Sequence, residues 1–329
     1  MAIVTIRDGL TFRCGPDQTI IDAALESGIV LDHSCTSGRC NSCEARVIEG
    51  RSRLLQPELS MSGDSSGVAK ILMCCRAAET DICLDVEGLT NFERYSPKVL
   101  PCKIDTLERV SPDVVELRLR FPPAVKFQFN PGQYVDLKSP TGVVRSYSIA
   151  NQSPDDALVL HIKNYKGGQM SRYVFEEARP DDLLSIRGPL GTFHLRNRST
   201  GRAIFIATGT GIAPILSMLS LCRDELIGQE VSVYWGVRAY EDFYCSVKKF
   251  DMIDHFRQVL SRSDHPSCMA GYVQDAVLGE IDDFRDASVY ACGSTDMIND
   301  AHKLFTSAGL EPERFFSDAF VESRKEGFF

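Results

Sequence analysis

The sequence lacks the features that mark three large classes of protein. No apolar run approaches the roughly 20 residues that a helix needs to cross a bilayer, so we expect no membrane partner. The first residues carry no basic segment followed by an apolar stretch, so we expect no signal peptide. The chain also lacks an excess of positive charge, because its net charge is −9. This charge argues against a nucleic-acid partner held by a broad basic field.

Cysteine, in contrast, is abundant. Twelve cysteines without a secretory signal fit metal ligation in a reducing cytoplasm better than a disulfide scaffold. The length of 329 residues allows two or three domains, each with its own core. The first 93 residues hold 8 Lys and Arg against 14 Asp and Glu. This acidic excess predicts either a face that steers a basic protein partner or an ordinary solvated surface.

Three cysteines lie close together in one short loop. Cys35, Cys40 and Cys43 follow the C-x4-C-x2-C spacing of a plant-type [2Fe–2S] centre, which needs one more cysteine downstream. Cys74 and Cys75 compete for that role. We prefer Cys74, because it follows a short apolar run as the ligand of plant-type ferredoxins does, and Cys75 is the alternative. Structural zinc is the other alternative, but zinc sites usually use two C-x2-C pairs.

The sequence around this loop predicts a small open sheet with the loop at its rim. Residues 3–14 alternate β-formers around an Asp-Gly turn and predict a hairpin, and residues 16–28 predict a short helix. Within the loop, Gly38 permits the bend that points backbone N–H groups at sulfur. Asn41 tolerates positive φ better than most residues, so the loop can also close there.

The middle of the chain is rich in β-patterned runs. Residues 94–101 contain two prolines and polar residues, and they predict a linker. The stretch from 102 to 199 then predicts an antiparallel barrel, because turn residues separate many short strands. These runs cover residues 102–110, 114–121, 134–138, 143–149, 158–163 and 183–187.

Three stretches of this predicted barrel suit a ligand. Arg145 and Tyr147 share one side of a strand, where a guanidinium can hold a pyrophosphate and a ring can lie against a flat cofactor. Gly168 and Ser171 lie where a helical run opens, and backbone amides at such a start suit an anion. Residues 188–193 predict a tight turn that lets backbone approach a ligand. Each stretch alone fits sheet packing or turn chemistry, but their combination predicts a cofactor site.

From residue 203 the pattern alternates between strand and helix. A buried-type strand over 203–207 leads into Gly209 and Gly211, ahead of an apolar helix over 215–226. A glycine loop between a strand and a helix start is where a dinucleotide phosphate lies. Pro214 replaces the third glycine of the usual G-x-G-x-x-G pattern, and proline is comfortable in a first helical turn.

Two more strands and a capped helix complete a predicted doubly wound parallel sheet. The strands cover 230–237 and 288–294, and Ser294 caps a helix over 296–308. Ligands are expected at the carboxyl ends of such strands. The side chains of this helix expected to face the core are Met297, Ile298, Ala301, Leu304 and Phe305.

Together these motifs resemble those of ferredoxin–NADP reductase-type flavoproteins with an N-terminal plant-type ferredoxin domain, across essentially the whole chain. The motifs are Arg145-x-Tyr147-Ser148 and Gly168-x-x-Ser171 for the flavin, and Gly209-x-Gly211-x-x-Pro214 and Cys292-Gly293 for the nicotinamide nucleotide. The resemblance implies a multidomain α+β and α/β fold. Its expected parts are a β-grasp ferredoxin domain over 1–93, a linker over 94–101, an antiparallel β-barrel FAD domain over 102–199 and a doubly wound parallel-sheet NAD(P) domain over 200–329.

The resemblance also implies roles for single residues. Tyr147 would stack on the isoalloxazine, and Arg145 would contact the flavin pyrophosphate. Phe320 would cover the opposite flavin face, with core packing as the alternative. The two expected catalytic residues are Ser148, near the reactive flavin edge, and Cys292, near the hydride-transferring carbon of nicotinamide. The alternative for Cys292 is a buried thiol at a strand end.

The implied activity is NAD(P)H-dependent electron transfer through FAD and a [2Fe–2S] cluster to a partner protein. NADH is the expected donor, because Glu241 and Asp242 disfavour the 2′-phosphate of NADPH. NADPH is the alternative, since Ser261 and Arg262 could bind that phosphate.

Two segments narrow the resemblance within the family. Val233-Tyr-Trp-Gly and residues 315–320 look most like CDP-6-deoxy-Δ3,4-glucoseen reductases of deoxysugar biosynthesis. This likeness implies a PMP-dependent sugar dehydrase as the electron acceptor. The alternatives are the reductase component of an aromatic-ring or alkane oxygenase and, from another class, a non-catalytic redox-sensing subunit.

Overall fold

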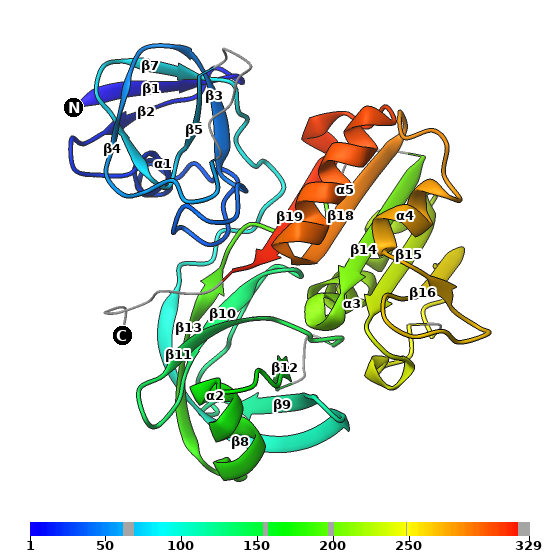
Figure 1. Ribbon diagram of the computed structural model, residues 1–329. Coiled ribbons are helices and arrows are strands. Elements are labelled where there is room, and N and C mark those ends of the chain that lie inside the picture. Colours follow the sequence, from blue (N-terminus) through cyan, green and yellow to red (C-terminus); the bar gives the residue numbers. More distant parts are fainter. Residues whose placement is uncertain (62–68, 154–156, 197–200, 248, 322–329) are drawn as a thin grey trace. The chain divides into compact units, whose positions relative to one another are not determined.

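The computed structural model describes residues 1–61, 69–153, 157–196, 201–247 and 249–321 of the chain. The described residues form two compact units, and most of their helices and strands are labelled in Figure 1. The first unit comprises Met1–Arg94 together with the short segment Gly191–Phe193, and the second comprises Tyr95–Leu190 and His194–Phe320. None of the helices that the structure describes is long and apolar enough to cross a membrane.

The first unit is a five-stranded mixed sheet with one helix packed against it, in the strand order β2-β1-β7-β3-β5. β1 and β2 form the predicted hairpin, and Gly9 takes a φ of 82° in its turn. β1 pairs in parallel with β7, and the remaining pairs are antiparallel. This is the β-grasp arrangement that the family resemblance implies. The bounds are β1 Ala2–Ile6, β2 Thr11–Cys14, β3 Glu44–Glu49, β4 Ser52–Leu54, β5 Lys70–Leu72, β6 Arg76–Ala78 and β7 Ile82–Leu84.

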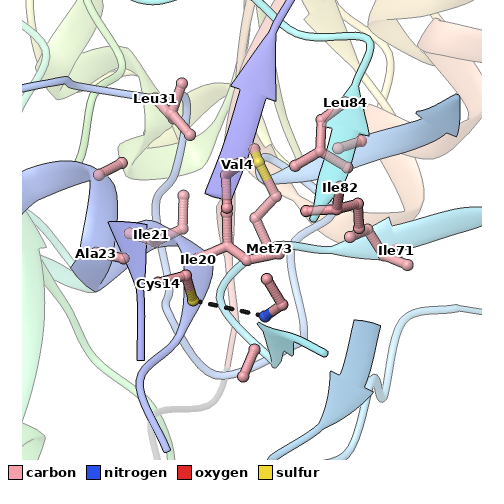
Figure 2. Close-up of a cluster of buried hydrophobic side chains, with 14 of the residues drawn as sticks. Val4, Cys14, Ile20, Ile21, Ala23, Leu31, Ile71, Met73, Ile82 and Leu84 are labelled. Carbon is pink, nitrogen blue, oxygen red and sulfur yellow. Dashed lines mark hydrogen bonds between the residues drawn. The ribbon is translucent and has the colours of Figure 1, made fainter. Parts of the chain in front are cut away.

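Helix α1 (Ile20–Glu26) covers the core of this unit. The Oγ1 of Thr19 accepts a hydrogen bond from the Asp22 N–H at 3.1 Å, which caps its start. A helix of 7 residues is too short to be stable alone, so its stability comes from burial. Figure 2 shows Ile20 and Met73 meeting Val4 in this core.

The second unit contains a six-stranded antiparallel sheet in the order β11-β10-β13-β8-β9-β12. An antiparallel bridge between Ile149 and Leu160 joins the residue after β11 to β12, so the sheet closes into the predicted barrel. Both residues are buried in its core. The bounds are β8 Lys98–Ser111, β9 Val114–Arg120, β10 Tyr134–Lys138, β11 Val144–Ser148, β12 Leu158–Lys163 and β13 Leu183–Leu190.

Two local predictions in this region are wrong. Residues 98–101 of the predicted linker belong to β8, where Pro101 pairs with Ser185 of β13. Proline is tolerated there because β9 pairs with β8 only from Lys103 onward, which leaves this part of β8 at a sheet edge. Residues 188–190, predicted as a turn, continue β13. Gly188 serves close strand packing instead, since a Cβ there would lie 2.7 Å from Val135 Cγ1.

The second unit also contains a six-stranded parallel sheet in the order β17-β16-β15-β14-β18-β19. The chain runs outward from β14 through β15 and β16, then returns to β18 on the other side of β14. β14 and β18 therefore flank the switch point of a doubly wound sheet. The bounds are β14 Arg202–Thr208, β15 Glu230–Val237, β16 His255–Leu260, β17 Met269–Ala270, β18 Ala287–Ser294, β19 Phe315–Phe320, α3 Ile212–Leu221, α4 Val273–Leu278 and α5 Thr295–Ser307.

The first helix of this sheet begins earlier than predicted. A 3-10 turn at Gly209–Gly211 leads directly into α3, so the helix covers 212–221 instead of 215–226. Pro214 lies in its first turn, as expected. Residues 223–226 form a separate 3-10 turn. A periodic apolar pattern predicts helical structure here but does not separate these two pieces.

Helix α5 confirms the predicted cap but corrects one side chain. The Ser294 Oγ accepts a hydrogen bond from the Met297 N–H at 3.3 Å. Leu304, predicted to face the core, is 36% exposed. Phe305 is fully buried, and its ring stacks on Phe284 with 4.9 Å between centroids.

We predict that Phe305→Ala lowers the free energy of unfolding by about 3–5 kcal/mol, because the buried ring leaves a cavity. Leu304→Ala is the matched control and should cost less than about 1 kcal/mol, because surface substitutions have small effects. Denaturation of the holoprotein can be followed through the fluorescence of Trp235. This single tryptophan is fully buried on β15 of the parallel sheet. Equal losses in the two variants would contradict the burial assigned to α5.

Candidate cofactor sites

The cysteine loop between α1 and β3 brings four thiols together in two pairs. The Cys40 thiol hydrogen-bonds to Cys35, and the Cys43 thiol hydrogen-bonds to Cys74. A [2Fe–2S] cluster contains two irons, each held by two cysteine sulfurs. Two thiol pairs therefore fit a two-iron cluster better than they fit one zinc ion. Among the residues that the structure describes, no group of three or more His, Cys, Asp or Glu side chains is placed to hold a single metal ion.

One thiol in each pair is already favoured as the thiolate. The hydrogen bond from Cys40 lowers the pKa of Cys35 to about 5. The hydrogen bond from Cys43, followed by that from Cys75, lowers the pKa of Cys74 to about 3. Iron ligation requires the thiolate form, so this arrangement suits it.

Backbone N–H groups point at sulfur, as the sequence predicts. The N–H groups of Ser37 and Arg39 donate to the Cys35 Sγ, each at 3.4 Å. Gly38 takes a φ of 71°, and a Cβ there would lie 2.3 Å from the Pro57 carbonyl oxygen. Asn41 also takes a positive φ, of 59°. Both expectations about the bends of this loop are confirmed.

The two candidates for the fourth ligand differ in environment. Cys74 lies against Cys43 and accepts a hydrogen bond from the Gly38 backbone. The Cys75 Sγ lies 3.6 Å from Cys74 Sγ and 3.6 Å from the Pro57 carbonyl oxygen. Its hydrogen bond to Cys74 raises the pKa of Cys75, so Cys75 keeps its proton. Cys74 is thus better placed than Cys75 to pair with Cys43.

An ion pair between Glu58 and Arg76, which the sequence does not indicate, holds residues 57–58 over the cysteine loop. Glu58 lies 2.7 Å from Arg76, and its carboxylate also accepts the Leu72 N–H at 2.7 Å. Glu58 and Arg76 are 18 residues apart and each is an ordinary surface residue by type. Only the pairing of β4 with β6 and the return of the chain from Cys74 bring them together.

In the barrel, β11 carries Arg145 and Tyr147 two residues apart, as predicted. The Arg145 side chain is exposed, and no carboxylate among the described residues pairs with it. Tyr147 is half-buried, and burial raises the pKa of its hydroxyl, so it stays protonated. An unpaired guanidinium beside an aromatic ring fits the flavin that the motif implies.

Gly168 and Ser171 form one compact turn before the barrel's helical segment. Gly168 precedes helix α2 (Gln169–Arg172), and a Cβ there would lie 3.0 Å from the Ser171 Oγ. The Ser171 hydroxyl accepts the Tyr165 N–H at 2.9 Å. Ser171 therefore shapes the turn, and Gly167, at a φ of 78°, leaves open space beside it.

The glycine loop of the parallel sheet lies where its two halves diverge. A Cβ on Gly211 would lie 2.2 Å from the Cys292 carbonyl oxygen. Gly293 takes a φ of 145°, and a Cβ there would lie 2.0 Å from Thr208 Oγ1. Ligands of doubly wound sheets bind at such a switch point, so the residues present fit a dinucleotide. Gly209, at a φ of 54°, completes the loop.

Asp318, which the sequence did not indicate, links Ser148 to Cys292. The Ser148 Oγ donates to Asp318 Oδ2 at 3.5 Å, and Asp318 is the β19 partner of Cys292. Cys292 is fully buried, and burial followed by the charge of Asp318 raises its pKa. Its thiol is therefore neutral. Phe320, half-buried, pairs with Ser294 at the end of β19.

The residues weighed for nucleotide preference lie at the ends of β15 and β16. The Asp242 carboxylate accepts the Ala239 N–H at 3.1 Å, so it caps a turn. The Arg262 N–H donates to the Arg238 carbonyl oxygen at 3.1 Å, which ties the two strand ends together. Acidic and basic groups thus both lie in this region.

Comparison with known proteins agrees with this arrangement. Residues 4–79 match the family of 2Fe-2S iron-sulfur cluster binding domains, residues 101–195 the oxidoreductase FAD-binding domain and residues 205–303 the oxidoreductase NAD-binding domain. The CDP-6-deoxy-L-threo-D-glycero-4-hexulose-3-dehydrase reductase of Yersinia pseudotuberculosis is 38% identical over 96% of this chain and 97% of its own length. Terephthalate 1,2-dioxygenase reductase component 1 of Comamonas sp. is 28% identical over 95% of each chain.

Among solved structures, the Amycolatopsis cytochrome P450 reductase GcoB is similar with a TM-score of 0.73 and 27% identity, over 97% of this chain and 99% of that one. The matches span all three parts of the chain, including both strand-rich sheets and the cysteine loop. The chain therefore belongs to the ferredoxin reductase-type flavoproteins with a 2Fe-2S domain, and it is an NAD(P)H-dependent flavin and iron–sulfur reductase that uses NADH, FAD and a [2Fe–2S] cluster and passes electrons to an acceptor protein.

Proposed function

We propose that this reductase delivers electrons to a separate, PMP-dependent dehydrase that acts on a CDP-linked deoxysugar. The observation that carries the proposal is the 38% identity, over nearly the whole chain, to a reductase named for such a dehydrase. The dioxygenase reductase component is 10 percentage points less similar over the same span, at 28%. The abundance of cysteine, with four of the twelve assigned to the cluster, supports a reducing cytoplasm as the setting.

When bound, the cofactors supply the redox chemistry: NADH gives a hydride, the flavin accepts two electrons and the cluster carries one electron at a time. The protein binds and orients these groups. In our proposal Tyr147 lies against the flavin ring, Arg145 and the turn of Gly168 and Ser171 hold its pyrophosphate, and Ser148 faces its reactive edge. The exposed guanidinium of Arg145 supports this assignment.

The nucleotide is assigned to the switch point. Gly209, Gly211 and Pro214 shape the loop and helix start, and Gly293 lets β18 approach it. Cys292, as a neutral thiol, is proposed to contact the nicotinamide without acting as a nucleophile. We assign Phe320 to the flavin face opposite Tyr147. We propose domains over 1–93, 98–199 and 200–329, with the linker shortened from 94–101 to 94–97 because 98–101 belong to β8.

A second acceptor class deserves an equal test, because the resemblance to an oxygenase reductase spans 95% of the chain. The reductase, with NADH, should be combined either with a PMP- and iron–sulfur-dependent dehydrase and its CDP-6-deoxysugar, or with a terephthalate-type oxygenase and its aromatic acid. We expect product only from the dehydrase mixture. Equal or faster hydroxylation would transfer the proposal to the oxygenase.

Cys40→Ser is the control for this experiment. It removes one thiol of the first pair, so it should lose the cluster and all turnover of the acceptor. Reduction of ferricyanide by NADH needs only the flavin and should persist. Ferricyanide activity that disappears as well would show that the two cofactor sites do not fold independently.

The choice of Cys74 as fourth ligand predicts different results for two neighbouring substitutions. Cys74→Ser should abolish the cluster's absorbance and its paramagnetic signal after reduction, because it leaves Cys43 without its partner. Cys75→Ser should keep two irons per chain, since Cys75 only donates a hydrogen bond to Cys74. Iron analysis of anaerobically purified protein measures both. The reverse result would assign the ligand to Cys75.

Arg145→Ala is expected to weaken flavin retention by about 10-fold or more, since hydrogen bonds to a charged group contribute about 1.5–3 kcal/mol. The measurement is the dissociation constant of FAD by fluorescence. Arg172→Ala is a suitable control, because Arg172 is exposed and already pairs with Glu177 at 3.2 Å. Unchanged flavin affinity in Arg145→Ala would remove Arg145 from the site.

A further inference from the structure

A line of polar side chains runs from the flavin barrel into the parallel sheet. His161 lies on β12, and its side chain is only 2% exposed. Its Nδ1 lies 3.0 Å from the Tyr244 hydroxyl, and its Nε2 lies 3.5 Å from Glu116. Glu116 and His161 are direct cross-strand partners on β9 and β12. Tyr244 follows β15, so the line joins the two sheets of the second unit.

An ion-paired carboxylate forms the acidic end of this line. The Arg118 side chain donates to the Glu116 carboxylate at 2.9 Å. His161 and Arg118 together lower the pKa of Glu116 to about 2, so this group is an acceptor. His161 Nδ1 and the Tyr244 hydroxyl are hydrogen-bond partners. Burial raises the pKa of Tyr244, so its hydroxyl keeps its proton.

Tyr244 continues the line to the glycine loop. Its ring stands edge-on to the ring of Trp235, with 5.3 Å between centroids and 88° between planes. Trp235 is fully buried on β15, and its indole N–H donates to the Gly209 carbonyl oxygen at 2.9 Å. A change in the position of Tyr244 would therefore shift the glycine loop through the Trp235 ring and its hydrogen bond to Gly209.

Lys163 makes a second connection from the same strand. It lies two residues beyond His161, so both side chains leave the same face of β12. Its Nζ lies 3.2 Å from Asp113. A Cβ on Gly209 would lie 3.8 Å from that Nζ. The strand that carries His161 thus lies directly against the glycine loop.

We propose that Glu116, His161 and Tyr244 form a positioning line that sets the glycine loop, and with it the nicotinamide, at the distance from the flavin barrel that hydride transfer needs. The proposal rests on the flavin and nucleotide sites proposed above. Reacting atoms must approach to about 3–3.5 Å, and a misplacement of about 1 Å can cost about 100-fold in rate. Tyr244 is thus a positioning residue, because its hydroxyl lies within hydrogen-bond distance of His161 and its ring packs on Trp235.

Tyr244→Phe tests this role, because it removes the hydroxyl and leaves the ring against Trp235. Flavin reduction by NADH should be followed anaerobically by stopped flow over a range of NADH concentrations. We expect the limiting rate of reduction to fall by about 10-fold, while the NADH concentration at half the limiting rate changes by less than about 2-fold. FAD content should remain that of the wild type. Tyr272→Phe, which removes an exposed hydroxyl, is the control.

A double-substitution cycle separates the hydrogen bond from general damage. His161→Gln should also slow reduction, and the double variant should be no slower than the slower single variant, because both remove one bond. Additive losses, or a limiting rate in Tyr244→Phe equal to that of the wild type, would overturn the positioning line. A wild-type flavin that NADH does not reduce would instead overturn the flavin and nucleotide sites proposed above, so the two failures are distinct.

Discussion

The ends of β14 and β18 can meet only where side chains are absent. A Cβ on Gly211 would lie 2.2 Å from the Cys292 carbonyl oxygen, and one on Gly293 would lie 2.0 Å from Thr208 Oγ1. This approach sets the place of the glycine loop at the switch point. Through the pairing of Cys292 with Asp318 it also sets β19, and Asp318 accepts the Ser148 hydroxyl of the barrel. The positions of the glycine loop and of β19 in the second unit depend on these two close contacts.

Sequence patterns predicted the elements whose determinants are local. The β-runs of the barrel, the hairpin at the start of the chain and the Ser294 cap of α5 depend on neighbours a few residues away. The errors arise where tertiary pairing decides. Pro101 is compatible with a strand only because β9 does not reach that part of β8. Gly188 is explained by Val135 on the adjacent strand, which no local pattern reveals.

The candidate sites divide in the same way. The spacing of Cys35, Cys40 and Cys43 is itself the signal of a cluster, and the structure adds which thiols pair. Contacts between distant residues escape a single sequence. His161 and Tyr244 are 83 residues apart, and Ser148 and Asp318 are 170 apart. These residue types are common in any sequence, so only the fold shows that these particular residues pair.

Four side chains around the proposed flavin and nucleotide sites are not poised to exchange protons near neutral pH. Burial raises the pKa of Tyr147, Tyr244 and Cys292, so all three stay protonated near neutral pH. An efficient general acid or base would need a pKa close to the working pH. Glu116, with a pKa lowered to about 2, is equally remote from that range. These side chains can align the cofactors and exclude water, and the redox chemistry itself belongs to the cofactors.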